Sequence, residues 1–240
     1  MSIEDYGLFF SPNRDKPYRF LGTELKHKNK LEQLLGLVGT SLQSPSPVVT
    51  ASLFAKYYSY ALIAGGLYSL IHLGEKLDLS LNNISLETGE KWSPSLVLDQ
   101  KPIGMERGQG KKETLDLLFL ENLQPVYDNL VDHTGIKRQV LWAHASYAVN
   151  YLSRKWREEA QDDAEHIRLE EDFQLILSTV EDLQIEFTSI DHPLFRGEKL
   201  TLRKECCLRS CLPNASSCTT CPNIEHAVRK DLLVEYHAKG

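Results

Sequence analysis

Apolar residues recur every three or four positions over most of the chain, which is the spacing of amphipathic helices. Within RFLGTELKHKNKLEQLLGLVGTSL, the residues Leu31, Leu34, Leu35 and Val38 follow this spacing, so the whole stretch is predicted to be one helix. After SPSP, the run VVTASLFAKYYSYALIAGGLYSLIHL is apolar on nearly every side, as is typical of a buried helix. Small residues in this run would let a neighbour pack closely. They are Ala61, Ala64, Gly65 and Gly66.

Between Leu77 and Ile103 the pattern changes to an alternation of apolar and polar residues around the turn sequence TGEKWSP. This alternation predicts a small β-hairpin, and the segment before the first helix is expected to be irregular. Helical spacing returns in four later segments, and Pro125 should kink or divide the first of them. The segments are residues 111–135, 137–160, 165–183 and 224–238.

The pattern as a whole predicts a mainly α protein with a small β part, an α+β fold. We expect a helical body over residues 1–193 and a cysteine-rich segment over residues 194–240. A chain of 240 residues with 42% hydrophobic residues can bury a full core. Aromatic side chains at helical spacing are more typical of such a core than of a ligand groove, which is the alternative. The aromatic set is Tyr57, Tyr58, Tyr60, Tyr68 and Trp142.

The net charge of -6 disfavours general attraction to nucleic acid or to anionic lipid. The longest apolar run, from Tyr57 to Ile71, is shorter than the ~20 residues that span a bilayer, so no transmembrane segment is expected. The start MSIEDYGLFF has neither the basic stretch nor the apolar stretch of a secretory signal. We therefore expect a cytoplasmic protein.

All five cysteines lie within KECCLRSCLPNASSCTTCPN. In a reducing compartment, clustered thiols bind metals or carry out redox chemistry more often than they form disulfides. An odd number with two adjacent members also suits a disulfide framework poorly. Four of the cysteines have the spacing C-C-x10-C-x2-C, and Cys211 lies between the two halves. The four are Cys206, Cys207, Cys218 and Cys221.

Only one half of this pattern is a C-x2-C knuckle, whereas structural zinc sites usually take two. Adjacent cysteines direct their side chains apart, which a two-iron cluster accommodates because it offers two ligand sites on each iron. The spacing favours an iron-sulfur cluster and leaves structural zinc open.

The arrangement C-C-x10-C-x2-C near the C-terminus of a largely helical chain of this size resembles that of the FhuF-like siderophore-iron reductases. The stretch LWAHASYAV around Trp142 is similar to a Leu-Trp helix of the same family. This resemblance implies a 2Fe-2S cluster held by Cys206, Cys207, Cys218 and Cys221. It also implies an oxidoreductase for iron acquisition, which reduces siderophore-bound Fe(III) to Fe(II) by electron transfer in the cytoplasm.

Cys211 is a fifth thiol for which the family's four-ligand pattern has no place. We expect it to be a spectator, and its use as a ligand in place of Cys207 or Cys218 is the alternative. Three cations flank the cysteines and would favour a reduced, more negative cluster and attract an anionic ferric complex. Ordinary solvated charges are an equally good interpretation of them. These cations are Arg203, Lys204 and Arg209.

The sequence contains no Rossmann-type dinucleotide fingerprint and no Walker-type lysine motif. A reductase of this kind would therefore take electrons from a separate donor, such as a flavoprotein or a ferredoxin. The alternative function is a structural zinc module that binds a protein or a siderophore without redox activity. A redox or iron sensor is a third interpretation, disfavoured because no nucleic-acid-binding motif is recognised.

Overall fold

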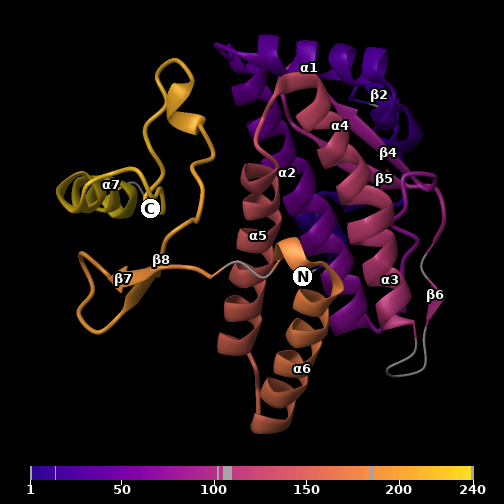
Figure 1. Ribbon diagram of the computed structural model, residues 1–240. Coiled ribbons are helices and arrows are strands. Elements are labelled where there is room, and N and C mark those ends of the chain that lie inside the picture. The colour runs from indigo at the N-terminus through magenta and orange to yellow at the C-terminus, as the bar shows by residue number, and fades with distance from the viewer. Residues whose placement is uncertain (1, 14, 102, 105–109, 184–185, 239–240) are drawn as a thin grey trace.

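A computed structural model describes residues 2–13, 15–101, 103–104, 110–183 and 186–238. The fold is mainly α with a small β part, as predicted. Figure 1 shows α2 within the helical body and the C-terminal segment, in orange to yellow, on one flank. The helices are α1 Lys28–Leu42, α2 Pro47–Tyr68, α3 Lys111–Leu118, α4 Gln124–Thr134, α5 Arg138–Glu158, α6 Asp163–Thr179 and α7 His226–Ala238.

Helix α2 is the buried helix that the apolar run predicts. The hydroxyl of Ser46 accepts a hydrogen bond from the backbone N–H of Val49, and Pro47 occupies the first helical position. The helix continues into the π turn η3 (Ser69–Leu73) and ends at Gly74, whose φ of 65° is left-handed. Most of its side chains are buried, so α2 has neighbours on nearly every side.

Helix α1 is shorter than the sequence predicts. The residues before Lys28 form strand β2 (Tyr18–Leu21) and the 3-10 turn η2 (Gly22–Lys26) instead. In β2 only Phe20 is buried, and the strand is defined by its pairing with β4, from Tyr18 opposite Thr88 to Leu21 opposite Ser85. The prediction was wrong there because contacts with a distant strand outweigh local helix propensity.

The predicted hairpin is confirmed as β4 paired antiparallel with β5, but these strands form the centre of a larger sheet. The sheet has the order β1-β5-β4-β2, with β1 parallel to β5 and β2 antiparallel to β4. Two strand pairs, β3 with β6 and β7 with β8, lie outside it. The strands are β1 Leu8–Phe9, β2 Tyr18–Leu21, β3 Glu75–Lys76, β4 Ile84–Thr88, β5 Ser95–Leu98, β6 Ile103–Gly104, β7 Ser189–Asp191 and β8 Lys199–Thr201.

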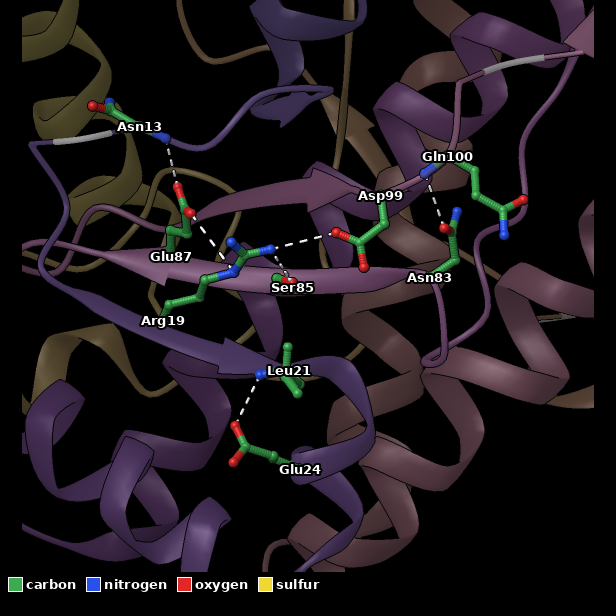
Figure 2. Close-up of polar contacts among 9 residues, drawn as sticks. All are labelled: Asn13, Arg19, Leu21, Glu24, Asn83, Ser85, Glu87, Asp99 and Gln100. Atoms are coloured by element: carbon green, nitrogen blue, oxygen red, sulfur yellow. Dashed lines mark hydrogen bonds and ion pairs between the residues drawn. The ribbon is translucent and has the colours of Figure 1, made fainter.

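Polar contacts attach the N-terminal segment to this sheet (Figure 2). Arg19 on β2 donates a hydrogen bond of 3.0 Å to the hydroxyl of Ser85 and lies 3.4 Å from the carboxylate of Asp99. The buried carboxylate of Glu87 accepts a 2.8 Å hydrogen bond from the backbone N–H of Asn13. The segment that the sequence predicts to be irregular therefore contributes strand β1 to the sheet, and the start of the predicted first helix contributes most of β2.

The remaining helices follow the sequence pattern. The π turn η4 (Phe119–Leu123) separates α3 from α4, and Pro125 lies in the first turn of α4, so the predicted division is confirmed. Helices α5 and α7 lie within the predicted segments, and α6 begins two residues before its predicted segment, at Asp163. The boundary at residue 194 stays a prediction, and the paired strands β7 and β8 lie on either side of it. In the part of the chain that the structure describes, no helix combines the length and apolar character needed to cross a bilayer.

Gly65 allows strand β1 to pack against α2. A Cβ atom at this position would lie 2.7 Å from the Cβ of Leu8, which is too close for two carbon atoms. At Gly36, on the exposed face of α1, an added Cβ would meet no atom within 4 Å. The close packing predicted from the small residues of α2 is therefore confirmed at Gly65.

We predict opposite effects for two Gly-to-Ala changes. Gly65→Ala should lower the free energy of unfolding by roughly 1 to 2 kcal/mol, because overpacking outweighs the gain in helix propensity. Gly36→Ala should raise it by about 0.5 to 1 kcal/mol, because only the propensity changes. Urea unfolding of both variants measures the difference. Equal effects of the two changes would contradict the close contact between β1 and α2.

Candidate metal centre

The cysteine segment has little regular structure. The structure describes all of residues 202–225, and within them the chain forms one 3-10 turn, η6 (Arg209–Cys211). Leu208 adopts a left-handed conformation with φ of 59°, and its N–H lies 3.4 Å from the sulfur of Cys206. The N–H of Cys221 donates a 3.0 Å hydrogen bond to the carbonyl of Cys218 and closes the C-x2-C turn. These local turns direct the sulfur atoms of both halves toward one another.

The four motif cysteines form two pairs. The sulfur atoms of Cys207 and Cys218 lie 3.4 Å apart, and those of Cys206 and Cys221 lie 3.7 Å apart. Each pair joins one of the adjacent cysteines to one cysteine of the knuckle. The pairs are free thiols, without disulfide bonds. The sequence predicts that the side chains of the adjacent Cys206 and Cys207 diverge, and the two residues do lie in different pairs.

The spacing within each pair suits two ligands of one metal ion. Metal-thiolate bonds of about 2.3 Å at tetrahedral angles place two sulfur atoms about 3.8 Å apart. Within the described part of the chain, no three His, Cys, Asp or Glu side chains converge on a position for a single ion. A 2Fe-2S cluster takes two thiolates on each iron, so two pairs are the donor set that it requires. The number and pairing of the thiols match the ligand set of a two-iron cluster, which stays a prediction.

The surroundings shift the pKa values of the thiols in opposite directions. Hydrogen bonding from the Cys218 thiol lowers the pKa of Cys207, and the positive charge of Lys56 adds to this effect. The same hydrogen bond raises the pKa of Cys218, and burial raises the pKa of Cys206. Because the thiolate is the form that binds metals, Cys207 is the sulfur most ready to act as a ligand.

Two helices of the body support Cys207. The hydroxyl of Ser52 on α2 donates a 3.0 Å hydrogen bond to the carbonyl of Cys207, and it lies 3.0 Å from Nε2 of His144 on α5. Since the hydroxyl hydrogen of Ser52 is already used, Nε2 of His144 must donate. Burial, with the charges of Arg203 and Lys56, holds the pKa of His144 well below its ordinary value, so the ring is neutral. One turn after Ser52, Nζ of Lys56 lies 3.9 Å from the sulfur of Cys207.

Helix α7 holds the other half of the motif through Arg229, which is buried. Its guanidinium donates to the carbonyl of Thr219 and, at 3.1 Å, to the carbonyl of Ile224. These acceptors lie on either side of Cys221, so one side chain spans the turn that carries this cysteine. Burial lowers the pKa of Arg229, and the nearby sulfur of Cys221 opposes the shift.

The flanking cations predicted from the sequence have different surroundings. The guanidinium of Arg203 lies 3.9 Å from the ring centroid of Tyr147, a cation-π contact. Lys204 and Arg209 are exposed, and Cys211 is also exposed. Arg203 is thus the cation of the three that the structure places against the body. The ligand assignments and the roles of these cations stay predictions.

Sequence reasoning missed four residues of this centre. Ser52 and Lys56 contact Cys207 across a large sequence separation, and His144 acts through Ser52. Arg229 reaches the knuckle from the last helix. The spacing of Ser52 and Lys56, one helical turn apart, places them on one face of α2. That signal does not say which face meets the cysteines, because the contact depends on tertiary packing.

The predicted aromatic set is divided between core and surface. Tyr58 and Trp142 are fully buried, as predicted for a core. Tyr57 and Tyr60 are partly exposed and line a cavity beside Arg203 and Lys56. A ligand groove therefore stays a prediction for Tyr57 and Tyr60.

Comparison with known families gives an independent result for the helical body. The family described as ferric iron reductase FhuF-like transporter matches residues 52–183, more than half of the chain. The protein belongs to this family. The match begins at Ser52 and includes Lys56 and His144, and it ends before the four cysteines. A comparison with curated proteins found no match.

We predict that Arg229→Leu loosens the knuckle. Hydrogen exchange of residues 218–224 should become faster, because two carbonyls lose their charged donor. Exchange in α2 and α5 should stay unchanged. Lys230→Leu is the matched control, since the neighbouring Lys230 is exposed. An unchanged exchange rate in the Arg229 variant would contradict the assigned clamp.

Proposed function

We propose that this protein is a ferric-siderophore reductase that holds a 2Fe-2S cluster. The ligands in this proposal are Cys206, Cys207, Cys218 and Cys221. Membership of a family described as ferric iron reductase supports the reaction class, an oxidoreductase that acts on ferric iron. The observation that supports the 2Fe-2S cluster is the arrangement of the four thiols in two pairs, with sulfur–sulfur distances of 3.4 and 3.7 Å. A bound cluster of this kind would supply one electron at a time.

The proposed substrate is Fe(III) held by the oxygen donors of a siderophore. One added electron gives Fe(II), a less highly charged ion that such ligands hold less strongly. Release of iron therefore follows from reduction. The reaction needs proximity and a suitable potential rather than a nucleophile or a general base.

The residues around Cys207 have two roles in this proposal. Lys56 and Arg203 bring positive charge to the thiolates, which favours a more negative centre. Ser52 and His144 fix the backbone of Cys207 through successive hydrogen bonds. The site therefore combines fixed geometry with local positive charge in a chain whose net charge is -6.

The two parts of the chain would have different roles. Residues 1–193 would bind the substrate, and residues 194–240 would carry the cluster. Electrons would come from a separate donor, such as a flavoprotein or a ferredoxin. We place the reaction in the cytoplasm, because a reducing compartment keeps clustered thiols free to bind metal.

Two cysteine variants test the ligand assignment. Cys221→Ser should remove the visible absorption of the cluster and lower the rate of ferric-siderophore reduction by about 100-fold, because one iron loses a thiolate. Cys211→Ser is the matched control and should keep both properties, since Cys211 is exposed and lies outside the two pairs. Absorption spectra, iron content and turnover would be measured on the same anaerobic samples.

Full retention of colour and turnover in Cys221→Ser would refute the ligand set. Loss of both in Cys211→Ser would instead assign that thiol as a ligand. Stoichiometric zinc without colour in the unaltered protein would replace the reductase by a structural zinc module.

A further inference from the structure

A cavity of about 310 Å³ lies beside the candidate metal centre, between α2 and α5. Two helical stripes build it. Lys56, Tyr57 and Tyr60 come from α2, and Tyr147 and Tyr151 recur one turn apart on α5. Arg203, just before the first ligand cysteine, completes the wall. We call this the tyrosine cavity.

Its aromatic walls are partly open to solvent. Tyr57 is 42% exposed, Tyr60 is 38% exposed and Tyr151 is 36% exposed. Tyrosine offers a flat apolar ring and a hydroxyl that donates or accepts a hydrogen bond. At neutral pH the tyrosine hydroxyls keep their hydrogen, and burial raises the pKa of Tyr60 further. Walls of this kind suit a planar group with oxygen atoms at its edge.

Two cations give the cavity a positive charge. In the part of the chain that the structure describes, neither Lys56 nor Arg203 forms an ion pair with a carboxylate, and no acidic side chain lines the cavity. Arg203 is held over Tyr147 by the cation-π contact of 3.9 Å. These charges oppose the net charge of -6 of the whole chain, so they would favour an anion locally.

The cavity is also linked to the thiols. Lys56 lines it, and its Nζ lies 3.9 Å from the sulfur of Cys207. His144 is part of the same wall and donates to Ser52, which holds the carbonyl of Cys207. A ligand in the cavity would therefore lie next to the pair formed by Cys207 and Cys218.

We infer that the tyrosine cavity binds one planar aromatic arm of an anionic ferric chelate. The volume is near the lower limit of about 300 Å³ for small-molecule sites, so it suits one arm rather than a whole siderophore. The tyrosine rings would stack on the arm, and Lys56 with Arg203 would neutralise the charge of the complex. This inference rests on the proposed function, because it assigns the substrate class of the same centre.

Gallium(III) complexes test binding apart from reduction, because Ga(III) matches the charge of Fe(III) and accepts no electron under these conditions. The probes are a trianionic Ga(III) tris(catecholate) and a neutral Ga(III) trihydroxamate, each titrated by calorimetry into the metal-loaded full-length protein. The catecholate complex should bind about tenfold more tightly than the neutral one. Equal affinities would overturn the inference.

Tyrosine variants test the aromatic walls. Tyr57→Ala and Tyr151→Ala should each weaken binding of the catecholate complex by about three- to tenfold, through loss of a stacking surface. Tyr18→Ala is the matched control, because Tyr18 lies on β2, outside the cavity, and is also 36% exposed. Equal loss in the control, or no loss in either cavity variant, would overturn the assignment.

Arg203 variants test the charge. Arg203→Gln should weaken the catecholate complex by about tenfold and leave the neutral complex unchanged, and Arg203→Lys should restore most of the loss. The iron content must stay equal in all three proteins. A parallel loss for both probes would show a structural role and overturn the assigned charge.

The two proposals fail in different ways. If the protein binds the anionic probe selectively but does not reduce ferric siderophores, the binding role of the tyrosine cavity stands and the reductase function is refuted. If the tyrosine variants reduce ferric siderophores at the normal rate and no gallium complex binds selectively, the reductase function stands and the binding role of the tyrosine cavity is refuted.

Discussion

The packing of α2 against α5 is the contact on which the rest of the structure depends. Helix α2 is apolar on nearly every side, and it is buried because the sheet and the other helices surround it. Its partner α5 contributes buried residues such as Trp142 and His144. Once these helices are packed together, Ser52 and His144 come within hydrogen-bonding distance. The same packing aligns the tyrosines of both helices beside the cysteine segment.

The cysteine segment depends on this support because it has little regular structure of its own. Its backbone is held by Ser52 from α2, by Arg229 from α7 and by the hydrogen bond of 2.9 Å from the N–H of Arg203 to Thr220. Few apolar contacts contribute, since most of the segment is exposed or half-buried. Metal binding would therefore add to the stability of this region, as it does wherever ligands lie on irregular backbone.

The sequence predicted the helical body well, because each later helix buries a face marked by its own periodicity. It did not predict β1, which has only two residues, or β2, in which only Phe20 is buried, because such patterns are too weak to be recognised alone. The motif cysteines were found by their spacing. Their pairing could not be predicted, because it depends on the left-handed turn at Leu208, which the sequence does not reveal. Lys56 and His144 could not be found, because tertiary packing brings them to Cys207 and Ser52 from far away in the sequence. Arg229 lies close to the knuckle in sequence, but its spacing gives no sign that its side chain turns back to the carbonyls of Thr219 and Ile224.

The central claim is that four thiols in two pairs hold a two-iron cluster beside a positively charged cavity. Electron paramagnetic resonance of anaerobically purified protein, before and after dithionite, tests it most directly when iron and zinc are quantified in the same sample. The account predicts about two iron atoms per chain and a signal that appears only on reduction. A colourless protein with stoichiometric zinc and no signal in either state would contradict it.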